Sequence, residues 1–284
     1  LTQPKQPGPN LNRMSTHQYD LLIVGAGVSG TALLYLASRY TDLKRIGIID
    51  KYAAPARVNS LSSNNSQTLH CGDIETNYSL EKALKVQRAA RMVENYCVAQ
   101  RDKEHLIFKY PKMILGVGAR ECAALHQRFE LFGPHYPNLR QLDKQEIAKI
   151  EPEVAMHNGR FRDDEIFALG STDEYTAVDF EALARSFVRQ AQAAQAAQSK
   201  RIDIRYNETV QHITVQEGRF LVETQDTCYQ SRTLVVCAGG HSLKLAQDLG
   251  YGLHYSCLPV AGSYYFTPQI LNGKVYTVQN DKLP

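Results

Sequence analysis

Three glycines and one aspartate have the types and spacing that suit dinucleotide recognition. The glycines form the pattern Gly25-x-Gly27-x-x-Gly30, directly after the apolar run Leu21–Val24. The first allows a tight turn, the second lets the backbone approach a pyrophosphate, and the third lets a helix pack on the strand. Asp50 follows 20 residues after the third glycine, where a carboxylate accepts hydrogen bonds from ribose hydroxyls. The combination predicts dinucleotide binding, with a glycine turn in an unrelated α/β protein as the alternative.

A second turn of small residues follows a late apolar segment. Residues 233–237 (TLVVC) run directly into Ala238, Gly239 and Gly240. Residues this small let another backbone or a cofactor come close. The same pattern occurs in ordinary strand-to-helix turns, so its meaning depends on context.

A predicted hairpin supplies part of that context. Residues 208–216 and 219–224 alternate around Gly218, which indicates a hairpin or meander. With the two turns of small residues, this order resembles that of flavoproteins with two dinucleotide-binding domains. The resemblance implies FAD extended along the first strand–helix–strand unit, with the backbone of Val210 near the adenine.

A long polar connection, residues 51–68, separates the aspartate from the next regular element. Long loops inside a domain are usually functional or disordered. In the flavoproteins that the chain resembles, this segment runs along the pyrophosphate toward the flavin. Four short donors and acceptors suit that path, namely Asn64, Asn65, Ser66 and Gln67. A solvated surface loop is the alternative.

The residues that flank these motifs alternate between strand-like and helix-like patterns, as in α/β proteins. The first unit is predicted to contain a strand over 21–24, a helix over 28–40 and a strand over 44–50. Asp143 is expected to cap a short helix that ends before Pro152. Further helices are expected over 79–99, 119–132, 178–195 and 241–249, and strands over 108–117, 139–142, 161–169, 202–206, 229–237, 256–267 and 274–278.

The predicted fold class is α/β, with a Rossmann-like FAD-binding domain and a second, mixed α+β substrate domain. The polar, Pro-rich residues 1–13 are expected to be a disordered tail. We assign 14–78 and 175–250 to a discontinuous FAD-binding domain. Residues 79–174 and 251–284 are assigned to a substrate domain that is incomplete at the C-terminus, the second sheet of which is expected to be antiparallel.

The composition of the chain argues against several classes of function. The chain has 284 residues, 43% hydrophobic and 21% charged, as in ordinary globular proteins. A net charge of +3 does not indicate nucleic acid as the main partner. The sequence has no apolar run long enough for a transmembrane helix and no secretory signal pattern at its start. Its six cysteines include no CxxC pair, so we expect reduced thiols and no metal site.

A more specific resemblance rests on four stretches of sequence. They are VGAGVSG (24–30), NNSQTLHCGDIETNY (64–78), CLPVAGSYYF (257–266) and KVYTVQNDKLP (274–284). These stretches resemble malate:quinone oxidoreductases, in particular the epsilonproteobacterial type. The resemblance runs from about Ser15 to Pro284. Because members of that family are longer, we interpret the chain as an N-terminal fragment.

The resemblance implies oxidation of L-malate to oxaloacetate in the tricarboxylic acid cycle, with FAD as cofactor and a membrane quinone as electron acceptor. It also implies peripheral association with the cytoplasmic face of the membrane. The chemistry needs a base for the hydroxyl proton and cations for two carboxylates. His70 lies on the loop expected near the flavin and is the candidate base. A histidine that only hydrogen-bonds the loop is the alternative, and a base or carboxylate-binding arginine outside this chain is another.

Three further hypotheses stay open. One is another FAD-dependent oxidoreductase of the same fold that acts on 2-hydroxy acids or amino acids. The second is a non-catalytic nucleotide-binding module. The third concerns the aromatic run Tyr264-Tyr265-Phe266, which could pack in the core or form a wall of the substrate site.

Overall fold

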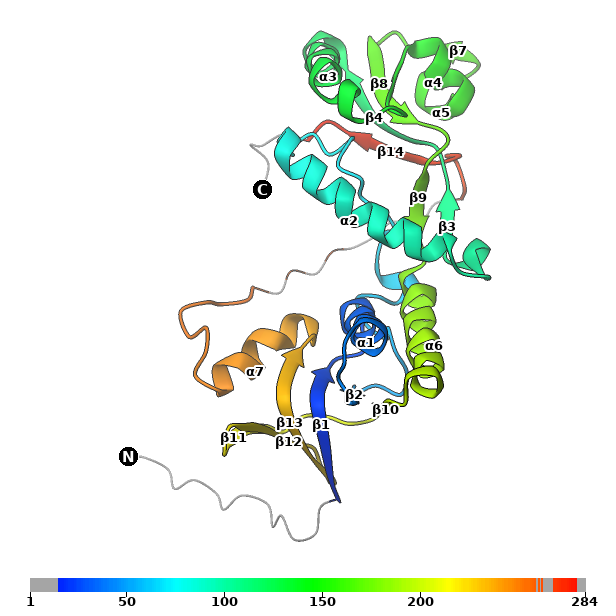
Figure 1. Ribbon diagram of the computed structural model, residues 1–284. Helices are drawn as coiled ribbons and strands as arrows, with labels where there is room; N and C mark the ends of the chain where they lie inside the picture. Colours follow the sequence, from blue (N-terminus) through cyan, green and yellow to red (C-terminus); the bar gives the residue numbers. More distant parts are fainter. Residues whose placement is uncertain (1–14, 259, 261, 263–267, 280–284) are drawn as a thin grey trace. The chain divides into compact units, whose positions relative to one another are not determined.

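The structure is a computed structural model that describes residues 15–258, 260, 262 and 268–279 (Figure 1). The predicted tail, the aromatic run at 264–266 and residues 280–284 lie outside the described residues. The described chain forms two compact units. Unit 1 contains the residues up to Ser66 and those from Phe180 to Val260; unit 2 contains Gln67–Asp179 and the residues from Gly262 onward. From the sequence, the boundaries between the two domains are expected near residues 78, 174 and 250. In the structure, the chain passes from one unit to the other after residues 66, 179 and 261.

Unit 1 contains a six-stranded sheet in the order β10-β2-β1-β13-β12-β11. Strands β10, β2, β1 and β13 are parallel, and β13, β12 and β11 pair antiparallel as a meander. Figure 1 shows the helices α1 and α6 side by side next to β1 and β2. The bounds are β1 Ser15–Val24, α1 Val28–Tyr40, β2 Arg45–Ile49, α6 Phe180–Gln198, β10 Arg201–Arg205, β11 His212–Gln216, β12 Arg219–Glu223, β13 Thr227–Val236 and α7 Ser242–Asp248.

Strand β1 lies in the middle of this sheet, and both of its faces are buried. Leu21 and Ile23 pack with Leu34 of α1 on one face of the sheet. Leu22 and Val24 lie on the opposite face, where they pack with residues of β11, β12 and β13. A strand buried on both faces reads as a continuous apolar run, as residues 21–24 do. Each such side chain contributes about 1.5–3 kcal/mol through burial. The core thereby fixes where β1 ends and the glycine loop begins.

Unit 2 is built on a four-stranded sheet in the order β14-β4-β8-β5. Alternate residues of β4 face opposite layers: Ile114 packs toward α3, and Met113 and Leu115 pack toward α4. The bounds are α2 Leu80–Val98, β3 Ile107–Lys109, β4 Lys112–Val117, α3 Gly118–Phe132, β5 Arg140–Leu142, α4 Lys144–Ile150, α5 Pro152–Ala155, β6 Met156–His157, β7 Arg160–Phe161, β8 Ile166–Ser171, β9 Tyr175–Val178 and β14 Lys274–Thr277.

The sheet of unit 2 is mixed, so the predicted antiparallel sheet was wrong in one respect. Strand β14 pairs parallel with β4, whereas β8 pairs antiparallel with both β4 and β5. No hairpin fixes the direction of β14, because the chain reaches it from the other unit. Its start is held by Glu151, which accepts hydrogen bonds from Asn272 N at 2.8 Å and Gly273 N at 2.6 Å.

Most elements of unit 2 lie where the sequence predicts them, and one predicted strand begins later than expected. Asp143 forms a capping box with Glu146 at the start of α4, as predicted for its cap. The strand predicted over 161–169 starts only at Ile166, because the polar residues before it follow the short β6–β7 hairpin. Of the strand predicted over 256–267, residues 256–258 are irregular and Leu258 is 85% exposed, whereas 259, 261 and 263–267 lie outside the described residues. In the described part of the chain, none of the helices is both long and apolar enough to cross a bilayer.

Candidate functional site

The glycine loop of unit 1 lies at the carboxyl end of β1, between β2 and β13. Gly25 N donates to Ile49 O at 2.8 Å, and Cys237 N donates to Val24 O at 2.7 Å. Gly25 has a φ of +107°, and a Cβ there would overlap the carbonyl oxygen of Cys237. A Cβ on Gly30 would overlap the carbonyl oxygen of Gly25. The loop therefore excludes side chains at both positions, because the backbones of β1, α1 and the turn after β13 lie in close contact there.

The N-terminus of α1 offers the amide groups that bind phosphate in dinucleotide folds. Gly27 is the N-cap of this 13-residue helix and supplies no capping side chain. The buried hydroxyl of Ser60 takes that place, because Val28 N donates to Ser60 Oγ at 3.0 Å. Sequence reasoning missed Ser60. Its only signal was a serine within the polar loop.

Asp50 directly follows β2 and connects the glycine loop to the next turn through its hydrogen bonds. Its Oδ2 accepts from Ala26 N at 2.6 Å, and its Oδ1 accepts from Tyr52 N at 2.8 Å. An ionised carboxylate has about four lone-pair positions, so these bonds leave acceptor capacity on each oxygen. Asp50 is therefore fixed in place with room to accept from a diol.

The asparagines of the polar loop shape the loop itself. Asn64 Nδ2 donates to Val58 O at 2.9 Å, and Asn65 Nδ2 donates at 3.0 Å to both Asn59 O and Leu61 O. Ser66 closes this part of unit 1, whereas Gln67 belongs to unit 2 and its carbonyl accepts from Val178 N at 2.9 Å. The structure thus divides the predicted row of four residues between the two units.

The second turn of small residues lies beside the glycine loop. Ala238 precedes a short 3-10 turn, Gly239–His241, and Gly239 has a φ of +57°. Nothing lies within 4 Å of a Cβ built on Gly240. Val210 is half-buried against the cluster that contains Tyr19 and Leu22. Unit 1 therefore gathers both turns and Asp50 at the carboxyl ends of β1, β2 and β13, where ligands bind in open α/β sheets.

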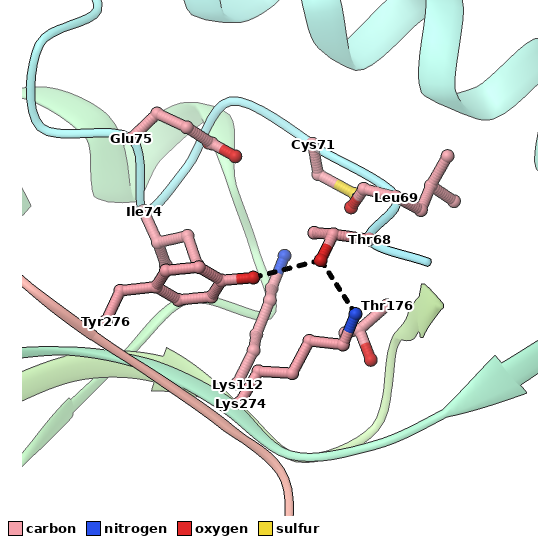
Figure 2. A pocket seen from close by; sticks show the side chains of 9 residues that line it. All are labelled: Thr68, Leu69, Cys71, Ile74, Glu75, Lys112, Thr176, Lys274 and Tyr276. Atoms are coloured by element: carbon pink, nitrogen blue, oxygen red, sulfur yellow. Dashed lines mark hydrogen bonds between the residues drawn. The ribbon is translucent and has the colours of Figure 1, made fainter. Parts of the chain in front are cut away.

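Unit 2 contains a separate small pocket, shown in Figure 2. Lys274 and Tyr276, both on β14, point toward Thr68 (Figure 2). Lys274 Nζ donates to Thr68 Oγ1 at 2.8 Å, and Tyr276 Oη lies 3.1 Å from the same oxygen. Burial lowers the pKa of Lys274 to about 8. The remaining lining residues are Leu69, Cys71, Ile74, Glu75, Lys112 and Thr176.

A buried ion pair supports the wall of this pocket. Lys112 Nζ lies 2.8 Å from the carboxylate of Asp73 and 3.2 Å from Glu174 Oε2. The side chains of Lys112 and Asp73 are only 3% and 2% exposed. Burial disfavours the charge on Lys112, yet Asp73 and Glu174 outweigh it and keep the pKa of Lys112 above its usual value.

The predicted base His70 lies next to this wall, paired with an acid that sequence reasoning missed. His70 Nδ1 is 2.7 Å from Glu75 Oε1; the histidine is 51% exposed and the glutamate 10%. Arg128 of α3 holds the same loop by donating to Glu75 O at 2.8 Å and Asp73 O at 3.2 Å. A lysine in the otherwise apolar strand 112–117 was the one sequence signal that a buried acid lay nearby.

Comparison with solved structures defines the class of protein. The chain is similar to glycine oxidase from Geobacillus kaustophilus, with a TM-score of 0.66, 17% identity, and coverage of 92% of this chain and 66% of that one. Its likeness to L-α-glycerophosphate oxidase from Mycoplasma pneumoniae has a TM-score of 0.62, 20% identity, and coverage of 92% and 65%. The predicted fold class is confirmed: a Rossmann-like domain of the flavoprotein type with a second, mixed domain.

Sequence comparison gives the family. The family model described as Malate:quinone oxidoreductase (Mqo) matches residues 17–279. A probable malate:quinone oxidoreductase from Campylobacter jejuni is 43% identical over 277 residues, which cover 95% of this chain and 61% of the relative. The Helicobacter pylori enzyme is 39% identical over 269 residues, 94% of this chain and 59% of the relative. The chain belongs to the malate:quinone oxidoreductase family, and it spans about three fifths of the length of these relatives.

Proposed function

We propose that the protein acts as an FAD-dependent malate dehydrogenase that oxidises L-malate to oxaloacetate and passes the electrons to a quinone. The observation that carries this proposal is the family match over residues 17–279. That range includes the glycine loop, Asp50 and the whole 64–78 segment. The fold shared with FAD-dependent oxidoreductases supports the same reaction class.

The residues of unit 1 fit the adenosine diphosphate end of FAD. The loop from Gly25 to Gly27 and the N-terminus of α1 would hold the pyrophosphate, since Gly25 and Gly27 carry no side chain and Gly27 supplies no cap. Asp50 would accept from the ribose hydroxyls, and the backbone of Val210 would lie near the adenine. Gly239 and Gly240 would leave room beside the cofactor, and Asn64, Asn65, Ser66 and Gln67 would follow its course. FAD, once bound, supplies the hydride acceptor for the oxidation.

The residues of unit 2 supply chemistry that a hydroxy dicarboxylate needs. His70 presents an imidazole for the hydroxyl proton. Lys274 and Tyr276 place an ammonium and a phenol at Thr68, donors of the type that hold carboxylates. We assign the base role to His70 and a contact with one malate carboxylate to Lys274.

A quinone acceptor requires access to the membrane. We propose that the protein associates peripherally with the cytoplasmic face of the membrane, as the family resemblance implies. The two substrates, malate and quinone, follow from the family to which the chain belongs.

A steady-state assay tests the proposal. The purified FAD-loaded protein should reduce a soluble quinone analogue with L-malate as donor, and with 2-hydroxyglutarate or amino acids at a far lower rate. The shared fold with glycine oxidase keeps an amino-acid or other 2-hydroxy-acid donor as the second candidate. Quinone reduction by one of those donors but not by malate would replace the first candidate with the second. A protein that takes up no FAD would instead be a non-catalytic nucleotide-binding module.

A further inference from the structure

Glu75, the acid that pairs with His70, has a role of its own. We propose that Glu75 is the positioning residue for His70: it holds Nδ1 and so presents Nε2 as the proton acceptor for a hydroxy-acid substrate. This inference rests on the proposed function, in which His70 is the base. Glu75 itself touches no substrate in this proposal and acts only through the imidazole.

The geometry decides which ring nitrogen accepts a proton. His70 Nδ1 lies 2.7 Å from Glu75 Oε1, a short hydrogen bond. An ionised carboxylate only accepts, so Nδ1 must carry the hydrogen and the lone pair must be on Nε2. The buried side of the pair is the glutamate and the half-exposed side is the histidine. The lone pair on Nε2 is thus available on a ring that a ligand can reach.

Glu75 stays ionised in this position. Burial would raise its pKa, but the hydrogen bond from His70, together with the charge of Lys112, holds the pKa of Glu75 below its usual value. The ionisable groups around it come from several elements: Asp73 on the same loop, Lys112 on β4, Arg128 on α3, Glu174 before β9, and Lys274 and Tyr276 on β14. The negative charges of Asp73 and Glu174 disfavour the ionised form of Glu75, whereas the positive charges of Lys112, Arg128 and Lys274 favour it.

The backbone of Glu75 is fixed as firmly as its side chain. Arg128 donates to Glu75 O at 2.8 Å, and Tyr78 N donates to the same oxygen at 3.0 Å. Lys112 anchors the loop two residues earlier, through Asp73. A carboxylate on a fixed backbone holds the ring in one orientation, which is what a positioned base requires.

One oxygen of Glu75 points to function rather than to stability. Within the described part of the chain, the buried Oε2 of Glu75 has no hydrogen-bond donor. A buried carboxylate oxygen without a donor is unfavourable, so a group placed only to stabilise the fold would gain little here. Glu75 lines the pocket that Lys274 and Tyr276 enter (Figure 2), so its carboxylate lies at the same pocket as the proposed carboxylate contact.

The proposed base step is the transfer of one proton from the substrate hydroxyl to His70. The O–H bond of the substrate breaks, its proton passes to Nε2, and the ring becomes an imidazolium that the Glu75 carboxylate stabilises. The carbon–oxygen bond becomes a carbonyl as the adjacent C–H bond breaks, and its hydride, with two electrons, leaves to the acceptor of the proposed function.

The first test reads the ring directly. Ring-nitrogen NMR on histidine-labelled protein, with the His70 signal assigned by its loss in His70→Asn, should show the Nδ1–H tautomer in the wild type. Glu75→Ala should give a mixture of tautomers or the Nε2–H form. An Nε2–H form in the wild type, or no change in Glu75→Ala, would overturn the proposal whether or not the protein oxidises malate.

The second test measures flavin reduction by the donor that works in the assay above. Glu75→Gln should lower the rate constant about 10–100-fold at nearly unchanged KM, the range seen when an orienting partner is lost. Glu75→Asp should restore part of the rate. The double variant with His70→Asn should be no slower than His70→Asn alone, because the two residues act as a unit.

A matched control separates positioning from a surface ion pair. His105 and Glu104 form a loose pair in the same unit, 3.8 Å apart, with both side chains mostly exposed. Glu104→Gln should leave the rate unchanged. A rate for Glu75→Gln as high as that of Glu104→Gln would overturn the positioning role. If no donor reduces the flavin, the proposed function fails and the NMR test alone decides whether Glu75 fixes the ring.

Discussion

At the scale of single residues, Asp50 has a structural task, and we propose a second one in ligand binding. Its bonds to Ala26 N and Tyr52 N fix the glycine loop. Asp50→Ala should therefore weaken FAD binding by roughly 1–3 kcal/mol, the scale for hydrogen bonds that involve a charged group. A fluorescence titration with FAD measures this change.

Asp20 offers a matched control for that titration. It accepts from two backbone amides, Lys44 N at 3.0 Å and Arg45 N at 2.9 Å, at the opposite end of β2. Asp20→Ala should lower stability while FAD affinity changes little. Equal affinity in wild type and Asp50→Ala would refute the ribose role, and an equal loss in both variants would show that only loop stability was affected.

Lys274 should give the protein a distinctive pH dependence. Its folded pKa of about 8 is lower than the value of about 10.4 for an unfolded lysine. Between those values the unfolded state binds the extra proton, so this residue makes the free energy of unfolding rise with pH, and burial of its charge is unfavourable below about pH 8. Lys274→Met should flatten that rise in urea denaturation. The same slope in both proteins would contradict the burial of this ammonium.

At the scale of the elements, the glycine loop depends on close contact between backbones. Gly30→Ala places a methyl group against the carbonyl of Gly25 and should separate α1 from β1, with loss of FAD binding. Gly240→Ala meets no protein atom within 4 Å and should keep the wild-type fold. Calorimetric titration with FAD, with circular dichroism to monitor folding, compares the two. Wild-type affinity in Gly30→Ala would contradict the described packing of α1.

The Lys112–Asp73 pair should behave as a buried charge pair. Asp73→Leu leaves Lys112 with only Glu174 and should cost about 3–5 kcal/mol, the range for breaking such a pair. The double variant Asp73→Leu/Lys112→Met removes both charges and should recover most of that loss. Urea denaturation of the wild type and these two variants gives their free energies of unfolding. A double variant no more stable than Asp73→Leu would show that the pair does more than neutralise its own charges.

At the scale of the elements, the sequence predicts features that depend on neighbouring residues, but not those that depend on contacts between distant residues. The bounds of α1 were predicted correctly, and Asp143 caps α4 as expected, because such features depend on neighbouring residues. Lys112 and Asp73 are 39 residues apart, and Arg128 lies 53 residues from Glu75. Pairings at such separations follow from the fold and leave no local pattern in the sequence. The contacts that hold His70 and its loop could therefore not be predicted.

At the scale of the molecule, the separation of tasks between the two units matters most. The dinucleotide motifs belong to unit 1, whereas His70, Glu75 and the Lys274 pocket belong to unit 2. The family-specific stretch 64–78 contains the boundary between them, at Ser66 and Gln67. The sequence predicted a discontinuous nucleotide domain, because glycine motifs identify strand ends far apart in the chain. It did not locate that boundary, since the polar loop shows no break in composition there.

The most direct test of the whole account is an anaerobic titration of the FAD-loaded protein with L-malate, monitored by the visible absorbance of the flavin. Malate should bleach the flavin, and a soluble quinone added afterwards should restore its absorbance. A flavin that remains oxidised with malate, yet is bleached by 2-hydroxyglutarate or an amino acid, would contradict the central claim.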